Sequence, residues 1–304
     1  MKRILVISYS QSGQLHEILD NFLAPFEGVE VEQVYVQPEK PFAFPWSSAV
    51  FFNIMPETVL EEKIALNDFS LQHDRYDLIV LGYQPWFLSP SLPTTALLQH
   101  PSFTKVLKDT PIVTVIGARN MWLNSQKSVV SHIQAAGGKL VANIPLIDRH
   151  QNLISALTIL HWMLTGKKER KWGFLPYPGV AENEIKGAGT FGKTVFDALN
   201  ANNYSGLQKA LLSQGKIDVH SSILFIEKRA KRLFSIWANL IKKKGTTSKK
   251  RNFWVGAYKY YLVIALFIVS PIVLTIYNIL IRPFTTKSIQ KDKDHFLYLG
   301  IDQS

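Results

Sequence analysis

The chain has 304 residues, of which 47% are hydrophobic, and it carries 34 Lys and Arg against 23 Asp and Glu. Residues 205–304 hold the whole positive excess, +12, because residues 1–204 carry 17 basic and 18 acidic side chains. A near-neutral domain with a basic tail argues against nucleic acid as a partner, since nucleic-acid binding needs a positively charged folded surface. The sequence has no cysteine, which excludes disulfides, thiolate metal sites and a thiol nucleophile.

Short apolar runs rich in Val and Ile alternate with helical patterns over residues 1–165. The runs predict five strands, at Ile4–Ser8, Val29–Val36, Asp77–Leu81, Ile112–Ile116 and Leu140–Ile144. Helical spacing is clearest at about 13–23, 124–136 and 151–165. Repeated strand–helix units of this kind predict an α/β fold, a doubly wound parallel five-stranded sheet with helices on both faces. We expect this domain to occupy residues 1–200.

Three polar or aromatic segments follow the first, third and fourth strands, where ligands of this architecture bind. Residues 8–15 read SYSQSGQL, with hydroxyls and a glycine at the start of a helix, a pattern suited to holding a phosphate. The segment has no lysine, so it is not a P-loop, and a simple helix cap by Ser10 or Ser12 is the alternative. Residues 82–93 read GYQPWFLSPSLP and predict a rigid aromatic wall. Residues 117–122, GARNMW, combine a glycine with polar groups.

With these three segments, the chain resembles the flavodoxin-like fold, and especially flavin-dependent NAD(P)H:quinone reductases. The resemblance implies FMN as cofactor and leaves NAD(P)H as a second candidate. It places the FMN phosphate on Ser10, Gln11, Ser12, Gly13, Gln14 and Leu15. It places the isoalloxazine ring between two further groups, Pro85, Trp86, Phe87 and Leu88 on one side and Gly117, Ala118, Arg119 and Asn120 on the other. Leu15 departs from the pattern, because many flavodoxins have threonine there.

A closer resemblance is to flavodoxin-like proteins of dialkylresorcinol and flexirubin-type pigment biosynthesis, which are often labelled dialkylresorcinol condensing enzymes. The opening MKRILVISYSQSGQL and the GYQPWFLSPSLP segment carry this resemblance. It implies oxidative aromatisation of a dialkylcyclohexanedione to a dialkylresorcinol, with a biosynthetic ketosynthase as partner for the condensation itself. The substrate would be a hydrophobic small molecule. The resemblance to quinone reductases also implies a homodimer.

Aromatisation of a dione needs hydride transfer and removal of a proton next to a carbonyl, which a positioned base or oxyanion donor assists. The candidate catalytic residues in the predicted loops are Tyr83, Arg119 and Asn120. Arg119 has two alternatives, to stabilise charge at the edge of the flavin or to pair with an acid on the surface. No two histidines have metal-binding spacing, so we expect no metal site. Asp148 and His150 follow the fifth strand, where a solvated loop is the favoured interpretation.

Residues 187–192, GAGTFG, match the G-x-G-x-x-G pattern of dinucleotide-binding proteins. They do not follow a predicted strand, and no acidic residue lies about 20 positions further on, so a second nucleotide site is not expected. A loop that covers the flavin pocket together with residues 172–178 is the favoured interpretation. The apolar 172–178 segment would either receive an alkyl chain or serve in packing.

The basic segment 201–253 contains an amphipathic helix, expected at 222–241. Its apolar residues have helical spacing, and its basic residues lie mostly off that stripe. Two interpretations are open: the stripe lies in the interface of an anionic membrane, or it packs on the preceding domain.

Residues 254–281 are expected to form one transmembrane helix, because 260–281 contains no charged residue and is long enough to cross a bilayer. A buried core helix and a hairpin bent at Pro271 are the alternatives. Seven Lys and Arg lie between 242 and 259, before the uncharged run 260–281, and four follow it in the short tail 282–304. The positive-inside rule then predicts a single-pass protein of the inner membrane with its N-terminal domain in the cytoplasm. The first apolar run, Ile4–Ile7, is too short for a cleavable signal.

The leading functional hypothesis is therefore a membrane-tethered, FMN-dependent oxidoreductase for a hydrophobic cyclic substrate. The alternatives are an NAD(P)H:quinone reductase and a non-catalytic electron carrier or scaffold in a biosynthetic complex. A carrier is expected to show an acidic docking face, and residues 1–204 contain no acidic run.

Overall fold

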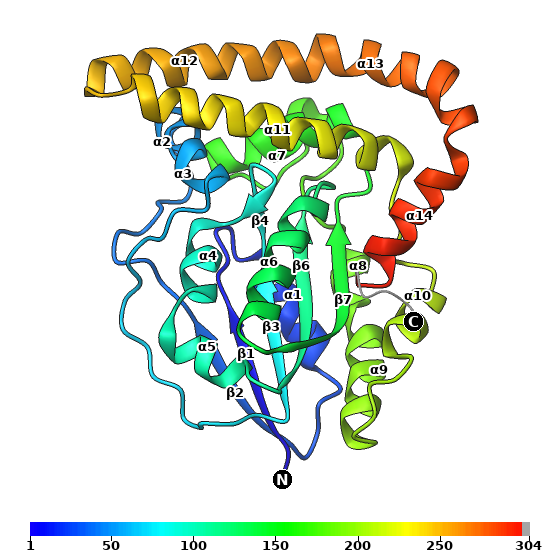
Figure 1. Ribbon diagram of the computed structural model, residues 1–304. Coiled ribbons are helices and arrows are strands. Elements are labelled where there is room, and N and C mark those ends of the chain that lie inside the picture. The colour runs from blue at the N-terminus through cyan, green and yellow to red at the C-terminus, as the bar shows by residue number, and fades with distance from the viewer. Residues whose placement is uncertain (300–304) are drawn as a thin grey trace.

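The computed structural model describes residues 1–299 and contains a five-stranded parallel sheet (Figure 1). The strands are β1 (Arg3–Ser8), β2 (Glu30–Tyr35), β3 (Leu78–Tyr83), β6 (Pro111–Ala118) and β7 (Lys139–Ile147). All pairs are parallel, and the order in the sheet is β2-β1-β3-β6-β7. This is the flavodoxin-like strand order, so the predicted doubly wound α/β fold is confirmed.

Alternate residues of the strands face opposite sides of the sheet and build two cores. Leu5, Ile7, Ile79 and Leu81 point to one side, which is covered by α4 (Leu92–Leu98), α5 (Pro101–Leu107) and α6 (Leu123–Ala135). Ile4, Val6, Leu78 and Val80 point to the other, which is covered by α1 (Gln14–Leu23), α8 (Glu182–Lys186), α9 (Ala188–Asn200) and α10 (Leu207–Ser213). The period-two side-chain alternation of a strand explains why the inner strands β1, β3 and β6 are largely apolar, whereas the edge strand β2 reads EVEQVY and is only partly buried.

The G-x-G-x-x-G segment begins helix α9 and does not form a loop over a pocket. A Cβ on Gly192 would lie 1.8 Å from the carbonyl oxygen of Phe22 in α1, and one on Gly189 would lie 3.1 Å from that of Asn21. The glycines therefore let α9 cross α1 with the two backbones almost in contact. The expectation of a pocket-covering loop at 187–192 is wrong, because these glycines serve helix–helix packing.

Between β2 and β3 the chain forms two short helices, α2 (Ser48–Asn53) and α3 (Met55–Val59). A small hairpin of β4 (Pro85–Trp86) and β5 (Ser89–Pro90) follows β3. Its two turn residues, Phe87 and Leu88, both have positive φ, 46° and 64°. Two consecutive left-handed residues match the twist of a tight hairpin but are costly for side chains other than glycine.

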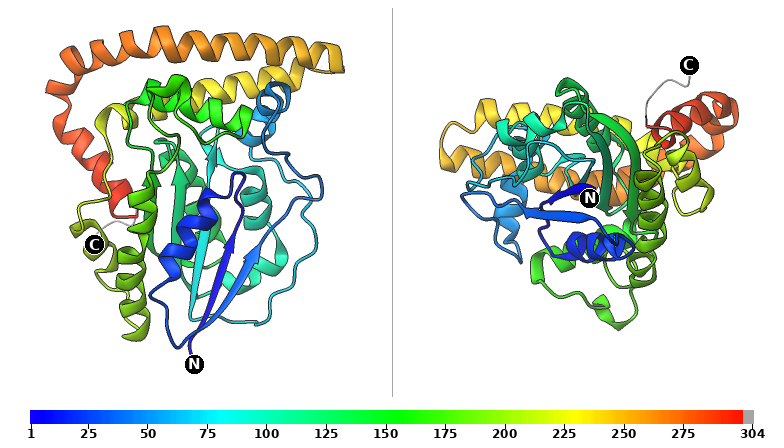
Figure 2. Two further views of the ribbon diagram at one scale, coloured as in Figure 1. Left: turned by 180° about the vertical axis from the view of Figure 1, so that it is seen from behind. Right: turned by 90° about the horizontal axis from the view of Figure 1, so that it is seen from below.

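The C-terminal helices lie over the carboxyl edge of the sheet (Figures 1 and 2). Helix α11 (Ser221–Lys244) crosses this edge, and Phe234, Ala238 and Ile241 join a third core cluster with α2 and α3. Its apolar stripe thus packs on the domain, one of the two alternatives drawn from the sequence. Helix α7 (Asn152–Thr165), which follows β7, also lies at this edge (Figure 1), and the 3-10 turn η1 (Lys171–Gly173) comes after it in the chain.

One helical stretch, Ser248–Phe284, is long and apolar enough to cross a membrane, by length and composition alone. It comprises α12 (Ser248–Ile264), η2 (Ala265–Val269), α13 (Ser270–Ile276), η3 (Tyr277–Ile281) and η4 (Arg282–Phe284). The π-helical η2 directly precedes Pro271, whose missing N–H and bulky ring disturb regular helical bonding. Helix α14 (Thr286–Leu297) then returns beside the α/β domain (Figure 1).

Candidate flavin site and the adjacent cavity

The three segments predicted to form a site come together at the carboxyl edge of the sheet. Tyr9, just after β1, packs edge-to-face against Trp86 of the hairpin at 5.9 Å between ring centroids. The amide oxygen of Gln84 accepts hydrogen bonds from the Gln11 N–H (3.0 Å) and the Trp86 Nε1–H (3.2 Å). Leu15 lies under Gly117, 3.5 Å from the position of a Cβ there. The topology therefore places the segments as the sequence led us to expect.

The first segment leaves the start of α1 open. Gly13 takes a left-handed φ of 85°, no side chain caps the helix, and a Cβ on Gly13 would meet nothing within 4 Å. Within residues 1–299, the backbone N–H groups of Ser12, Gly13 and Gln14 have no hydrogen-bond partner. Free N–H groups at a helix N-terminus favour an anion. The chemistry of this donor set fits a phosphate group.

The side chains of this segment have other roles than the resemblance implied. The Ser10 hydroxyl accepts from the Leu15 N–H at 3.3 Å, which is a local helix-start contact. The Gln14 Oε1 accepts from the Val180 N–H at 3.0 Å, and the Gln14 Nε2 donates to the Val180 carbonyl at 3.2 Å. Leu15 is buried in the core. Phosphate binding here would rest on the Ser12 hydroxyl and on the backbone. The Leu15 departure from threonine therefore has a packing reason.

An aromatic cluster lies beside this opening and includes residues that sequence analysis missed. Trp86 is packed edge-to-face by Phe42 (5.3 Å) and Trp46 (4.9 Å), in addition to Tyr9. The Gln11 amide donates to the carbonyls of Phe42 and Ala43, at 3.0 and 3.1 Å. The 41–46 segment, PFAFPW, has the same mixture of proline and aromatics as the hairpin, which was the signal available in the sequence.

The rest of the hairpin points away from this opening. Phe87 packs against Phe51 of α2 and Phe234 of α11, at 5.2 and 6.5 Å. Leu88 is buried, and Pro85 pairs with Pro90 across the hairpin. Of the four residues predicted to line the isoalloxazine from this segment, Trp86 is the one directed toward the first loop.

The third segment positions a buried positive charge. The Arg119 guanidinium donates to the backbone oxygen and the Oδ1 of Asn152, at 3.0 and 2.7 Å. Burial lowers the pKa of Arg119 to about 10, while Asp148 and Glu227 act in the opposite direction, so the side chain stays charged at neutral pH. Arg119 is buried, so it is not the surface ion pair that was one alternative, and its role at the flavin edge stays a prediction. Its hydrogen bonds are with Asn152 at the start of α7 and with the Met121 sulfur.

Asn120 is the candidate catalytic residue that reaches a cavity. Its Nδ2 donates to Asn152 Oδ1 at 3.0 Å, while its own Oδ1 is buried without a partner among the described residues. The neighbouring Gly117 and Ala118 are the last two residues of strand β6, and the Ala118 carbonyl accepts a hydrogen bond from the Asp148 N–H at 3.1 Å. A buried acceptor with no donor is costly, which makes this oxygen a candidate acceptor for a water or for a ligand hydroxyl.

Tyr83 lies inside the fold. It is fully buried, and its hydroxyl donates to Gln126 Oε1 at 2.5 Å. Burial raises the pKa of Tyr83 well above its ordinary value of 10, so it remains protonated. The Gln126 Nε2 donates a hydrogen bond to the Thr114 hydroxyl, which donates to Asn143 Oδ1. This network connects β3, α6, β6 and β7. This position gives Tyr83 a packing role, and the catalytic role expected for it stays a prediction that the geometry does not favour.

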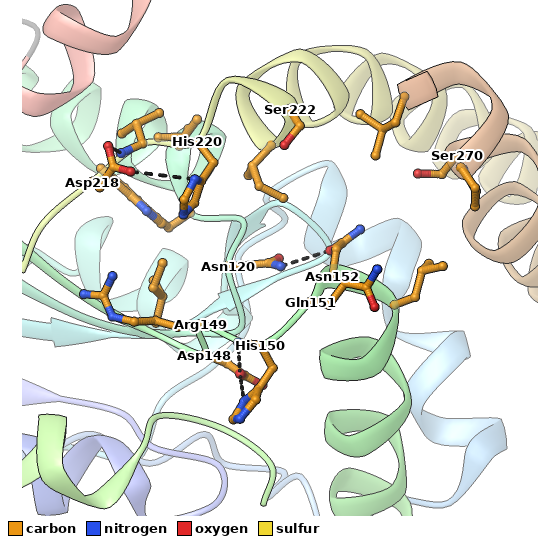
Figure 3. Close-up of a pocket in the computed structure, with 18 of the residues that line it drawn as sticks. Asn120, Asp148, Arg149, His150, Gln151, Asn152, Asp218, His220, Ser222 and Ser270 are labelled. Atoms are coloured by element: carbon orange, nitrogen blue, oxygen red, sulfur yellow. Dashed lines mark hydrogen bonds and ion pairs between the residues drawn. The ribbon is translucent and has the colours of Figure 1, made fainter. Parts of the chain in front are cut away.

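The cavity next to Asn120 has a volume of about 440 Å³ (Figure 3). One side comes from Asn120 and Trp122 in the loop after β6 and from Ile147 at the end of β7, and α11 contributes Ser222 and Ile223. The apolar helix closes it from above, with Ser270, Pro271 and Leu274 of α13. The cavity therefore lies between the carboxyl edge of the sheet and the helix that is apolar enough for a membrane.

Asp148 and His150 both line this cavity, but Asp148 is buried while His150 is exposed on the loop after β7, so the solvated loop favoured from the sequence holds for His150 and is wrong for Asp148. Asp148 is buried and accepts from the His150 backbone N–H (2.9 Å), His150 Nδ1 (2.7 Å) and the Ser155 hydroxyl (2.7 Å). The carboxylate thereby fixes both the turn after β7 and the start of α7. The aromatic 172–178 segment, in contrast, does not line the cavity: Trp172, Phe174 and Tyr177 are exposed.

Glu227 of α11 is a buried carboxylate that sequence analysis did not single out. Its Oε1 accepts from the Asn124 N–H at 2.7 Å, and its Oε2 has no partner within residues 1–299. Burial raises the pKa of Glu227 from its ordinary value of 4.5 to about 7, against the lowering effect of the Asn124 bonds and of Arg119.

We expect Glu227→Gln to stabilise the protein at high pH and not at low pH. Because the folded-state pKa lies above the unfolded-state value, the folded chain binds more protons between pH 4.5 and 7. The free energy of unfolding therefore falls as the pH rises through this range, by about 3 kcal/mol. Denaturant titrations of both proteins at pH 4.5 and 8 measure the difference. The exposed Glu39→Gln is the control, and a difference that does not change with pH would contradict the assignment.

Comparisons with known proteins find similar solved structures but no matching family model or curated sequence. Solved structures that match include a flavoprotein in complex with FMN from Lactobacillus acidophilus (17% identity, TM-score 0.38, 48% of this chain and 93% of that one). A flavodoxin from the domain Archaea matches at 9% identity and TM-score 0.36, over 65% of this chain and 99% of that one. A flavone reductase matches at 12% identity and TM-score 0.32, over 65% of this chain and 63% of that one. With TM-scores below 0.5, none of these decides the fold, which rests on the strand order.

Proposed function

We propose that the chain is a membrane-associated, FMN-dependent oxidoreductase. The observation that carries the proposal is the open start of α1, where Ser12, Gly13 and Gln14 present free backbone N–H groups beside an aromatic cluster. These groups would hold the FMN phosphate, and Trp86 would contact the flavin ring system. When bound, FMN supplies two-electron redox chemistry, while the protein supplies binding and orientation.

The substrate class we propose is a hydrophobic ring with oxygen substituents. The cavity beside Asn120 is partly apolar, with Leu123, Ile147 and Leu274 among its lining residues, and it lies next to the loop predicted to close on the flavin. The unpartnered Asn120 Oδ1 is a hydrogen-bond acceptor, which suits a hydroxyl of an enol or a phenol. A dialkylcyclohexanedione in its enol form and the corresponding resorcinol both carry such a hydroxyl.

The reaction we propose removes two hydrogens from a dialkylcyclohexanedione, one as a hydride and one as a proton, and leaves the aromatic dialkylresorcinol. Asn120 would orient the ring by accepting its hydroxyl proton in a hydrogen bond. The buried charge of Arg119 raises the positive potential beneath the loop that follows β6, where oxygen carries negative charge as the proton leaves. A ketosynthase is the partner that we propose for the preceding carbon–carbon condensation.

Membrane association gives this substrate a short route to the site. A dione with two alkyl chains partitions into a bilayer, and an enzyme held there meets it at a raised local concentration. We propose that Ser248–Phe284 holds the chain at the inner membrane with the α/β domain in the cytoplasm. Support comes from the length and composition of this stretch and from the basic residues on both of its flanks.

The test is turnover of a synthetic 2,5-dialkylcyclohexane-1,3-dione by the full-length chain in detergent, with added FMN and dioxygen as acceptor. We expect a product lighter by two hydrogens, identified by mass spectrometry. Asn120→Leu should lower kcat/KM by about tenfold or more, the effect of one lost hydrogen bond, while FMN content stays unchanged. Asn200→Leu, at an exposed position in α9, is the control. An FMN-loaded chain that does not oxidise the dione would contradict the proposed reaction.

The second candidate is a scaffold of the same fold that holds no flavin. The packing of Trp86 against Tyr9, Phe42 and Trp46 favours it, because these rings already cover each other. A quinone reductase would be distinguished by NAD(P)H-dependent reduction of a quinone in the same assay.

A further inference from the structure

The apolar stretch Ser248–Phe284 is attached to the α/β domain at both of its ends. Near its start, Arg251 Nη2 donates to the Asn53 carbonyl (2.7 Å) and to Glu57 (2.8 Å). Near its end, Tyr277 stacks on Phe225 of α11 with 3.9 Å between ring centroids. The stretch lies along α11 as the outermost layer at the carboxyl edge of the sheet (Figure 2).

The chain that follows this stretch is packed on the domain. Gln208 Nε2 donates to the Leu297 carbonyl at 2.8 Å, and Phe296 packs edge-to-face on Trp122 at 6.4 Å. Leu299 is buried in the core cluster that includes β1 and β3. A helix that crossed a bilayer would carry these residues about 30 Å away, to the other side of the hydrocarbon core. A spanning arrangement and these contacts exclude each other.

The outward side of the stretch is apolar and its flanks are basic. Ile268 is 58% exposed and Ile279 is 65% exposed, and together with Phe253, Val263, Ile264, Ile272 and Leu280 they form an uncovered apolar side. Lys249 and Lys250 lie at one end, and Arg282 and Lys287 lie at the other. Exposed apolar patches of this extent mark interaction sites, and basic flanks attract anionic lipid. The opposite, inward side is covered by α11.

We infer that Ser248–Phe284 does not cross the membrane but lies in its plane, with the α/β domain and α14 on the same side. The occupant of the apolar side is an anionic lipid bilayer. Pro271 and Leu274, which roof the cavity beside Asn120, then belong to the layer in contact with lipid.

The absence of cysteine in the chain allows a direct test by site-specific labelling. Gln290→Cys in α14 and Ser205→Cys in the domain both change exposed residues. Full-length single-cysteine proteins in inverted inner-membrane vesicles and in spheroplasts are treated with a membrane-impermeant maleimide. We expect both cysteines to react by more than about 90% in inverted vesicles and to be protected in spheroplasts, as two sites on one side of the bilayer must be.

Opposite protection of the two cysteines would overturn the inference in favour of a spanning helix. Recovery of the chain in the soluble fraction, alone or as a cross-linkable dimer, would also overturn it, because the apolar side would then be covered by something other than lipid. Neither readout depends on FMN or on turnover, so the outcome is independent of the proposed cofactor and reaction and bears only on the proposed membrane association.

Discussion

Ser12→Asp is expected to raise the Kd for FMN by about 100-fold or more. The substitution places a carboxylate at the open start of α1, where the phosphate would bind. Two negative charges about 4 Å apart near a protein surface repel by about 4 kcal/mol, and every 1.4 kcal/mol is a tenfold change in affinity. Titration of the cofactor-free, full-length chain with FMN, followed by quenching of flavin fluorescence, measures the effect.

Ser47→Asp is the matched control, because Ser47 is also at a helix N-terminus and its hydroxyl accepts from the Val50 N–H at 3.2 Å. Aspartate is an equally good cap, so this variant adds the same negative charge at a helix start, keeps the helix as stable, and should leave the FMN affinity within about twofold. Equal affinities of the wild type and the Ser12→Asp protein would show that the phosphate does not bind at α1.

Gly192→Ala is expected to lower the free energy of unfolding by about 3 kcal/mol. The new Cβ would lie 1.8 Å from the carbonyl oxygen of Phe22, a backbone atom that cannot rotate away. Helices α1 and α9 would have to separate, and the core between them, with Phe22 and Phe191, would lose its packing. Guanidinium unfolding followed by circular dichroism measures the change.

Gly256→Ala in α12 is the control, since a Cβ there meets nothing within 4 Å and alanine favours helices over glycine by about 1 kcal/mol. We expect this variant to be as stable as the wild type or slightly more stable. Unchanged stability of Gly192→Ala together with a loss of nucleotide affinity would reverse the interpretation and make GAGTFG a nucleotide-binding segment.

The sheet was predictable because each strand carries its own local signal. Runs such as Ile4–Ser8 and Ile112–Ile116 are apolar on both faces, which is typical of a buried parallel strand, and the structure extends them by only a few residues. The meeting of the loops after β1, β3 and β6 also follows from topology, since all parallel strands end at one edge. These parts of the site needed no knowledge of side-chain packing.

The parts of the site and of the C-terminal helix packing that were not predicted depend on contacts between residues distant in the sequence. The segment 41–46 reaches the first loop through the Gln11 amide, and Glu227 reaches Asn124 across more than a hundred positions. The docking of α14 depends on a hydrogen bond between Gln208 and the Leu297 carbonyl. Hydropathy alone identifies Ser248–Phe284 as apolar, but it carries no information on whether the following helix returns to the same domain.

The central claim, that the chain holds FMN at the start of α1, is tested most directly by purifying the full-length protein in detergent and recording its visible spectrum. The released cofactor is then identified and quantified. We predict an oxidised-flavin spectrum and about one FMN per chain, either as isolated or after addition of FMN. A colourless protein that takes up no added FMN would contradict the account and leave a membrane-associated scaffold of flavodoxin-like fold.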